Sequence, residues 1–245
     1  MPVVLTGGGS GIGRAIALRL AEEGARVGIL DLDAEGGAAT ETAVREGGGR
    51  AHAYRVDISD YDAVESAVAA FTAAEGAIRG LVNCAGWDVA ADFLDTQPDF
   101  WRKVIDINLV GPLNVTKVVL TRMVSAGSGR VVSIASDAGR VGSTGEAVYA
   151  ACKGGIIAFS KSVARELARQ GITLNTVCPG PTDTPLFANF EPTGRLARAL
   201  ERAIPMGRLA RPEDFPGLVA FLLSDDAGFI TGQTISVSGG LTMHG

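Results

Sequence analysis

The segment Thr6–Gly13, with the sequence TGGGSGIG, restricts the fold of this chain more than any other feature. It directly follows a short apolar run, Val3–Thr6, and it opens a helical pattern at Ile12–Glu23. Glycines at such a junction allow a tight turn and a close approach of the backbone to a pyrophosphate, which the N–H groups and dipole of the helix start attract. A plain glycine-rich turn is the alternative, but the strand–loop–helix context favours a nucleotide-binding loop.

Beyond this loop, short β-rich runs alternate with longer helical patterns. Strands are predicted at Val3–Thr6, Arg26–Leu30, Ala51–Val56, Gly80–Asn83, Arg130–Ile134, Thr173–Cys178 and Thr234–Val237. Helices are predicted at Ile12–Glu23, Glu35–Glu46, Tyr61–Ala74, Phe100–Ala126, Tyr149–Arg169 and Pro212–Leu223. This alternation indicates βαβ units, and the strands lack polar alternation, as expected when helices cover both faces. We therefore expect one doubly wound α/β domain over residues 1–245.

The segment Thr182–Pro205 breaks the alternation, because it is rich in proline and aromatic residues and shows helical spacing only in its second half. Such a segment is often a lid, so we expect a substrate lid at about 182–205. Residues that can line an apolar pocket, or simply pack the lid, are Trp87, Leu186, Phe187 and Phe190. Arg195, Arg198 and Arg202 recur at helical spacing, and this pattern favours a solvated helix face over a phosphate-binding surface.

The composition excludes several other classes of protein. Hydrophobic residues make up 47% of the chain and charged residues 20%, enough to bury a sizeable core. The net charge is −5 and no basic block occurs, which argues against nucleic-acid binding. Apolar runs are short and the N-terminus lacks the pattern of a signal peptide, so we expect a cytoplasmic protein without a membrane span. The three cysteines have no CxxC spacing; we expect reduced thiols and no metal.

Asp31 points to the choice of cofactor. It ends the second predicted strand, 18 residues after Gly13, where a carboxylate can accept hydrogen bonds from ribose hydroxyls and repel a 2′-phosphate. Its alternative role is to cap the next helix, but Asp33 is better placed for that. Ser10 and Leu32 stand where a basic residue would clamp a 2′-phosphate. These residues favour NAD over NADP.

Two further strand ends carry residues that can contact the cofactor, because ligands in such sheets bind beyond the carboxyl ends of the strands. Asp57-Ile58 follows the third strand and is expected near the adenine. Asn83-Cys84-Ala85-Gly86 follows the fourth and is expected near the nicotinamide ribose. Taken alone, Asp57 is more typical of a turn or cap.

Tyr149 and Lys153 are candidates for the chemistry. They are four residues apart on one predicted helix face, so the ammonium can lie near the phenol. Hydride transfer needs a group that takes a proton from an alcohol or gives one to a ketone, and a cation would lower the high pKa of tyrosine toward that task. Ser136, 13 residues before Tyr149, can hold the substrate oxygen, and Asn108 can kink its helix and anchor a water beside Lys153. The alternatives are that Tyr149 and Lys153 share a helix face by chance and that Ser136 is an ordinary turn residue after a strand.

Together these pieces resemble the short-chain dehydrogenase/reductase family over nearly the whole chain. The matching motifs are TGGGSGIG (6–13), Asp31, Asp57, NCAG (83–86), Asn108, Ser136, YAACK (149–153) and CPGPTDT (178–184). Two features depart from the family pattern. The first strand begins almost at Met1, and Cys84 stands where a second asparagine is usual.

The resemblance implies a Rossmann-type domain with a seven-stranded parallel sheet of order 3-2-1-4-5-6-7, and a homotetramer. It implies the catalytic tetrad Asn108, Ser136, Tyr149 and Lys153, with Pro179, Gly180, Thr182 and Thr184 beside the nicotinamide and phosphates. The expected cofactor contacts are Gly7, Ser10, Gly11, Ile12, Gly13, Asp31, Leu32, Asp57, Ile58, Asn83, Ala85, Gly86, Tyr149, Lys153, Pro179, Gly180, Thr182 and Thr184.

A closer similarity is to the subgroup that oxidises 2-hydroxycyclohexanecarboxyl-CoA with NAD, through residues 133–155, 203–209 and 224–243 and the triplet Gly86-Trp87-Asp88. The implied substrate is a β-hydroxyacyl-CoA thioester. An NADPH-dependent 3-oxoacyl-carrier-protein reductase is the alternative; a sugar or polyol dehydrogenase and a non-catalytic NAD-binding module are further ones. Asp31 counts against the NADPH-dependent reductase, the apolar lid against a polyol enzyme, and the complete tetrad against the idle module.

Overall fold

Seven parallel strands form one sheet in the order β3-β2-β1-β4-β5-β6-β7, which confirms the predicted fold class. The structure is a computed structural model that describes residues 1–190 and 194–243, apart from the side chains of Asn189 and Phe190. The strands are β1 (Pro2–Thr6), β2 (Arg26–Asp31), β3 (Arg50–Arg55), β4 (Gly80–Asn83), β5 (Gly129–Ile134), β6 (Ile172–Pro179) and β7 (Thr234–Val237). Each lies within two residues of its predicted bounds.

The register brings the carboxyl ends of the central strands to one edge of the sheet. Thr6, the last residue of β1, pairs with Leu30 of β2 and with Asn83 of β4. The chain runs outward from β1 to β3 and then resumes at β4 on the other side of β1. The strand order therefore reverses between β1 and β4, where ligands bind in open α/β sheets.

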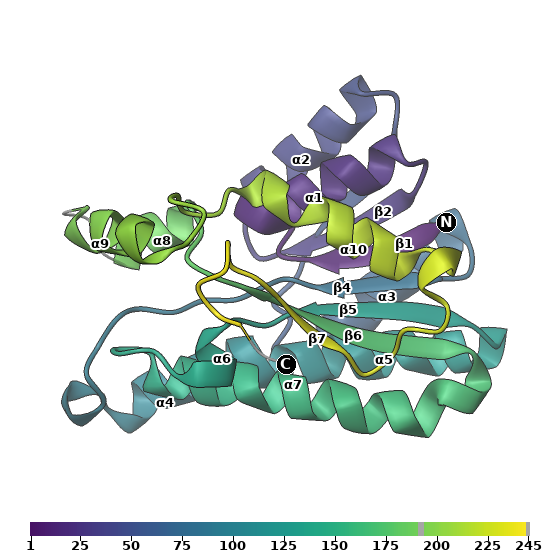
Figure 1. Cartoon of the computed structure of the whole chain (residues 1–245). Helices are drawn as coiled ribbons and strands as arrows, with labels where there is room; N and C mark the ends of the chain where they lie inside the picture. Colours follow the sequence, from purple (N-terminus) through teal and green to yellow (C-terminus); the bar gives the residue numbers. More distant parts are fainter. Residues whose placement is uncertain (191–193, 244–245) are drawn as a thin grey trace.

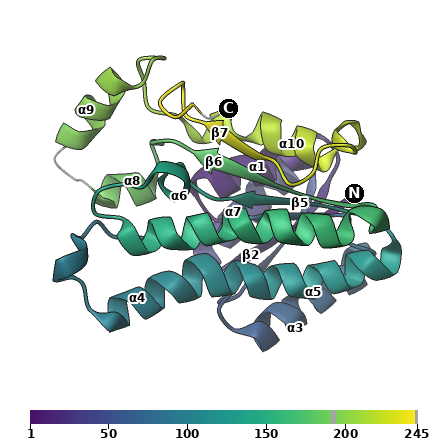
Figure 2. The ribbon, with the colours of Figure 1, turned by 60° about the horizontal axis from the view of Figure 1, so that its bottom comes forward.

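Helices cover both faces of the sheet (Figures 1 and 2). The longer ones are α1 (Gly11–Glu22), α2 (Ala34–Glu46), α3 (Tyr61–Glu75), α5 (Gly111–Ala126), α7 (Ala147–Leu167) and α10 (Pro216–Leu223). In Figure 1, α1, α2 and α10 lie above the sheet, and α3, α5 and α7 lie below it. Alternate strand residues point to the two layers: Val3 and Leu5 belong to the core under α1 and α10, and Val4 to the core over α3 and α5.

The long helix predicted at Phe100–Ala126 is interrupted. It consists of α4 (Pro98–Ile105), a π-helical turn (Asp106–Val110) and α5. The whole stretch Pro98–Ala126 is long and apolar enough by composition to cross a membrane, and half of its most apolar window is buried inside the fold. Its packing beside α7 and α3 in Figure 2 is that of a core helix, which passes the same composition test.

Two short helices lie in the segment predicted as a lid. They are α8 (Pro185–Phe190) and α9 (Arg195–Ala203), and they project beyond the carboxyl edge of the sheet in Figure 1. The sequence indicated helical spacing only in the second half, so α8 was missed. Its start is set by Thr184, whose hydroxyl accepts a hydrogen bond from the Phe187 N–H at 3.2 Å, followed by a proline at the first helical position. The four-residue helix α6 (Ala138–Val141) was also missed.

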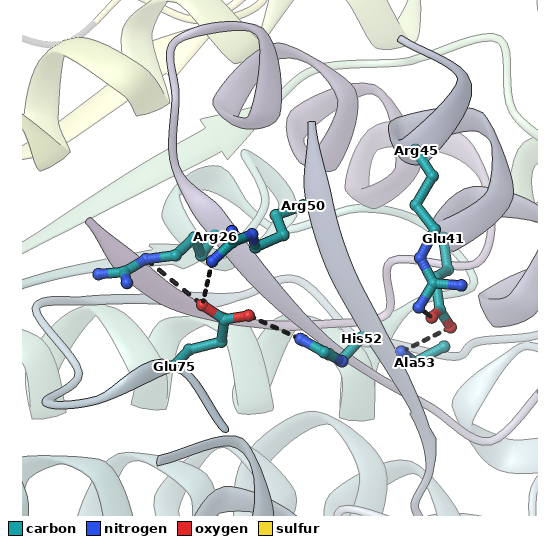
Figure 3. Close-up of polar contacts among 7 residues, drawn as sticks. All are labelled: Arg26, Glu41, Arg45, Arg50, His52, Ala53 and Glu75. Atoms are coloured by element: carbon teal, nitrogen blue, oxygen red, sulfur yellow. Dashed lines mark hydrogen bonds and ion pairs between the residues drawn. The ribbon is translucent and has the colours of Figure 1, made fainter. Parts of the chain in front are cut away.

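Charged residues tie β2, β3 and α3 together at the opposite, amino-terminal edge (Figure 3). The carboxylate of Glu75, buried at the end of α3, lies 2.8 Å from His52 Nε2 of β3. Arg26 and Arg50, the first residues of β2 and β3, each approach its other oxygen to 3.6 Å. In Figure 3 a second pair, Glu41 and Arg45 of α2, is seen on the other side of β3, where Glu41 accepts from the Ala53 N–H at 3.0 Å.

Candidate active site

A cavity of about 890 Å³ opens at the carboxyl edge of the sheet. It extends from the glycine loop after β1, past the ends of β4 and β5, to the lid helices. Most of the predicted site residues line it: Gly7, Ser10, Gly11, Ile12, Gly13, Asp31, Leu32, Asp57, Ile58, Ala85, Gly86, Ser136, Tyr149, Lys153, Pro179, Gly180, Thr182 and Thr184. Residues from 7 to 184 of the sequence thus meet around one space.

The glycine loop has the geometry of a phosphate cradle. Gly7 has φ +69°, and a Cβ there would lie 2.6 Å from Ala85 Cα; at Gly13 a Cβ would lie 2.0 Å from the Gly7 carbonyl oxygen. Only glycine fits these two positions. Ser10 is the N-cap residue of α1, yet its side chain makes no capping hydrogen bond. The N–H groups of the first helical turn therefore face the cavity as donors for an anionic ligand.

Asp31 lies at the end of β2, against this loop. Its Oδ2 accepts a hydrogen bond from the Gly9 N–H at 2.7 Å, and its Oδ1 accepts from the Asp33 N–H at 2.9 Å. The side chain is thereby fixed at the cavity wall, where it can still accept hydrogen bonds from ribose hydroxyls. Asp33 itself caps α2 through its side chain, as predicted.

Asp57 makes the hydrogen bonds of a turn residue, as its sequence context suggested. Its Oδ1 accepts hydrogen bonds from the Ser59 N–H at 2.9 Å and from the Ser59 hydroxyl at 2.7 Å. It also lines the cavity, where its contact with the cofactor stays a prediction.

Ser136, Tyr149 and Lys153 converge at the other end of the cavity. A hydrogen bond joins the Tyr149 and Ser136 side chains. The Lys153 ammonium is buried, donates to the Ile134 carbonyl oxygen at 3.1 Å and lies 5.3 Å from the centre of the Tyr149 ring. The phenol, the serine hydroxyl and the ammonium thus belong to one cluster, within which the four-residue spacing predicted the proximity of Tyr149 and Lys153.

The pKa of Tyr149 differs from the sequence-based expectation. Burial raises it well above its usual range, the nearby carboxylates of Glu146 and Asp88 raise it further, and the hydrogen bond with Ser136 lowers it. The sequence predicts that Lys153 lowers this pKa, and burial outweighs that effect. Burial also lowers the pKa of Lys153 itself. The helix spacing gives the proximity of the two groups, but it carries no information on how deeply the phenol is buried.

Asn108 and Asn83 lie outside the cavity lining. Asn108 is fully buried in the π-helical turn, where its amide donates to the Trp87 and Val104 carbonyl oxygens at 2.6 and 2.9 Å. Its Oδ1 accepts from the Trp87 N–H at 3.2 Å. Asn83 points into the core, where its amide donates to the Thr116 hydroxyl at 2.9 Å.

Asn108 is nonetheless close to the reacting groups. A Cβ built on Gly86 would lie 3.1 Å from Asn108 Oδ1 and 3.5 Å from Lys153 Nζ, so this glycine leaves the space where the two polar ends approach each other. Asn108 thus holds the loop after β4 in position beside Lys153. A π-turn at such a place is a common feature of functional sites.

The lid side of the cavity is largely apolar. Trp87, Leu186 and Phe187 line it as predicted, while the Phe190 side chain lies outside the described part of the chain. Leu196 and Leu200 of α9 also line it, and their four-residue spacing is the sequence signal that places them on one helix face. Arg195, Arg198 and Arg202 are exposed on the other side of α9, which agrees with a solvated face.

Two carboxyl groups at the reacting end were missed. Asp88 follows the NCAG segment and Glu146 precedes Tyr149 by three residues, and both line the cavity. Burial, together with the charge of Glu146, raises the pKa of Asp88 to about 7. In the sequence, Asp88 stands out only as part of the triplet Gly86-Trp87-Asp88, which carries the family resemblance.

Comparison with known proteins adds the following. A family model described as "Enoyl-(Acyl carrier protein) reductase" matches residues 7–242. The human (3R)-3-hydroxyacyl-CoA dehydrogenase is 39% identical over 254 residues, which cover 98% of this chain and 95% of that protein. Cis-4-hydroxycyclohexanecarboxylate dehydrogenase of Sinomonas cyclohexanicum is 40% identical over 240 residues, with 98% and 95% covered. The solved structure of a single-residue variant of actinorhodin polyketide ketoreductase with NADPH superimposes with a TM-score of 0.96 at 35% identity, covering 99% of this chain and 97% of that one.

Proposed function

This chain belongs to the short-chain dehydrogenase/reductase family and is an oxidoreductase that acts on hydroxyacyl or ketoacyl groups, and we propose that it interconverts a β-hydroxyacyl-CoA thioester and the β-keto thioester with NAD. The observation that carries the proposal is the cluster of Ser136, Tyr149 and Lys153 at one end of a cavity whose other end is the glycine loop with Asp31.

NAD is favoured by the residues at the adenosine end. The carboxylate of Asp31 is fixed at the cavity wall by the Gly9 N–H, at 2.7 Å. A 2′-phosphate beside it would meet like charge without a basic partner at Ser10 or Leu32. When bound, the nicotinamide accepts or supplies the hydride. The proposed contacts to the whole cofactor are those predicted residues that line the cavity; Asn83, whose side chain points into the core, is not among them.

The proposed proton chemistry belongs to Tyr149. Its raised pKa keeps the phenol protonated at neutral pH, so it is ready to give a proton to a keto oxygen that Ser136 holds in place. In the alcohol-oxidising direction the phenol must first lose its proton, so that rate rises with pH. Lys153 and Asn108 complete the site as positioning groups.

An acyl thioester is favoured by the apolar walls at the lid and by the hydroxyacyl relatives. Within this class we propose a cyclic substrate such as 2-hydroxycyclohexanecarboxyl-CoA. The broad aromatic surface of Trp87, which lines the cavity and packs against Phe100 at 6.0 Å between ring centres, suits a ring. One relative is named for a CoA thioester and another for a free ring carboxylate, so the substrates of these two relatives differ in whether the acyl group carries a negative charge.

We further propose that residues 182–205 act as a lid over a single nucleotide-binding domain, and that the protein is a cytoplasmic homotetramer. The lid has helices with apolar inward faces and exposed arginines on the outer face of α9. Four copies of the 25.2 kDa chain would be detected by sedimentation equilibrium.

The second candidate is an NADPH-dependent ketoacyl reductase. The likeness to a ketoreductase solved with NADPH favours it, and the carboxylate of Asp31 opposes it. If this candidate is correct, kcat/KM for reduction of a β-keto thioester would be higher with NADPH than with NADH.

Steady-state turnover with a matched panel tests the proposal. The panel holds 2-hydroxycyclohexanecarboxyl-CoA, linear 3-hydroxyacyl-CoA thioesters and plain secondary alcohols, each with NAD and NADP. We expect the cyclic thioester with NAD to have the highest kcat/KM. Activity confined to reduction of β-keto thioesters with NADPH would reject NAD dependence, and activity confined to plain alcohols would reject the thioester.

A further inference from the structure

Two acidic side chains, Asp88 and Glu146, face the reacting end of the cavity without a role in the chemistry above. Asp88 is 8% exposed, and its Oδ2 is buried without a hydrogen-bond partner. Such a group is costly to bury and unusual unless it serves a ligand. Glu146 lines the same space, and a second cavity of about 10 Å³, room for a single water, is also bordered by both acids and by Tyr149.

The backbone fixes the two acids beside each other. The Ala91 N–H, three residues after Asp88, donates to the Gly145 carbonyl oxygen at 3.0 Å. This bond joins the loop after β4 to the segment that leads into α7. Both acids are also close enough to Tyr149 for their charges to raise its pKa. An acyl group whose hydroxyl reaches Tyr149 therefore lies next to both acids.

The positive groups nearby offset the acids only in part. The charge of Lys153, whose buried ammonium donates to the Ile134 carbonyl oxygen at 3.1 Å, lowers the pKa of Asp88, but burial and the charge of Glu146 still leave that pKa raised. Lys103 lies 3.8 Å from the centre of the Trp87 ring and is exposed, so solvent and salt screen its charge. Asp137, also in the cavity wall, adds a third acid, and its partners are Ser236 and the charge of Arg140.

We propose that Asp88 and Glu146 are specificity-determining residues that exclude carboxylate anions from the reacting end, so that the enzyme accepts hydroxyacyl groups as neutral esters or thioesters and rejects the free hydroxy acids. The inference rests on the proposed function, whose acyl group it specifies. A free acid would place a further negative charge beside the buried carboxyl of Asp88 and the half-buried carboxyl of Glu146, in a region of low dielectric where such repulsion is strong. An ester carbonyl carries no charge and can accept a hydrogen bond from protonated Asp88.

The pH dependence follows from the same contacts. The pKa of Asp88 is about 7, raised by burial first and then by Glu146, and Lys153 opposes the shift. Above this pH a free acid can bind only if Asp88 takes up a proton, so its kcat/KM should lose about tenfold per pH unit against the rise that deprotonation of Tyr149 gives to both kinds of substrate. The kcat/KM of the ester should lack this decline.

The test compares substrates that differ only in this charge: methyl 2-hydroxycyclohexanecarboxylate and its free acid, and methyl 3-hydroxybutyrate and its free acid. The variants are Asp88→Asn, Glu146→Gln and, as a control for the same chemical change on an exposed residue, Asp92→Asn. At pH 8 we expect Asp88→Asn to raise the ratio of kcat/KM for the free acid to kcat/KM for the ester about tenfold. Asp92→Asn should keep the parent ratio of ester to acid.

An unchanged ester-to-acid ratio in Asp88→Asn, with esters still turned over, would overturn the inference. If Asp88→Asn fails to fold, Glu146→Gln decides by the same ratio. If the parent enzyme oxidises no hydroxyacyl ester or thioester, the proposed function has failed. In that case the acids and esters are compared as competitive inhibitors of whichever alcohol it does oxidise: weaker inhibition by the acids supports the exclusion of anions, and equal inhibition rejects it.

Discussion

At the scale of single residues, the sequence predicted which residues lie at the cavity better than it predicted the surroundings of their side chains. The spacing of Tyr149 and Lys153 placed them on one helix face, and the structure brings both to the cavity with Ser136. The direction of the Tyr149 pKa was wrong because burial, the largest cause, comes from elements distant in the sequence. Asp88 and Glu146 were missed for the same reason: 58 residues separate them, and no local pattern shows that they meet.

Asp31→Ala tests the assignment of the cofactor. Loss of charge-assisted hydrogen bonds to the ribose should weaken NAD binding by about 1.5–3 kcal/mol, and removal of the negative charge should improve the use of NADP. The measurement is kcat/KM for NAD and NADP on the same alcohol. Asp33→Asn, which keeps a capping side chain on the neighbouring residue, should behave like the parent. An NAD-to-NADP ratio that stays at the parent value would refute the ribose contact.

At the scale of elements, the alternation of strands and helices could be predicted, because each strand is a short apolar run and the apolar residues of each long helix recur at helical spacing. Strand bounds agree within two residues, and β4 and β7 agree to the residue. The interruption of α4–α5 contains Asn108, where the sequence predicted a kink, but the helical spacing that continues through it gives no sign of a π-turn. Only the structure shows that the Asn108 amide bonds to the Trp87 backbone.

Asn108→Leu tests whether this contact positions the loop. The variant leaves the Trp87 N–H and carbonyl without their partner, and we expect a lower Tm and a loss of kcat larger than the rise in KM. An unsatisfied buried backbone group costs about 1–3 kcal/mol. As a comparison, Asn114→Leu removes amide bonds to Ile58 and Ser59, away from Lys153. It should lower Tm with less effect on kcat. Equal effects of both variants on kcat would contradict a positioning role for Asn108.

At the scale of the whole molecule, the cavity and the buried charged cluster around Glu75 lie at opposite edges of the sheet. The carboxyl edge carries the cavity, and the amino edge carries the Glu75 cluster of Figure 3. This separation allows the cluster to contribute to folding without touching the cleft. The sheet order itself was predictable from the family resemblance, whereas the pairing of Glu75 with His52 was not, because it depends on where α3 ends against β3.

Glu75→Gln should destabilise the protein in a pH-dependent way. The hydrogen bond from His52, followed by the charges of Arg50, His52 and Arg26, lowers the pKa of Glu75 below 4.5. A carboxyl whose pKa is lower in the folded state contributes stability above its unfolded pKa, and this contribution is lost as the pH falls through the folded pKa. We expect a lower Tm than the parent at pH 7 and a difference that narrows below pH 4.5. The exposed Glu46→Gln is the control, and a constant Tm difference from pH 7 to pH 3 would count against this account.

The central claim is that Tyr149 moves the proton in hydride transfer between NAD and the alcohol. The most direct measurement is the single-turnover rate of Tyr149→Phe with NAD and the best substrate of the panel, together with NADH binding by fluorescence. The account predicts a rate at least about a hundredfold below the parent, with NADH affinity kept, because only the phenolic hydroxyl is removed. A Tyr149→Phe variant that binds NADH and oxidises the alcohol at the parent rate would contradict it.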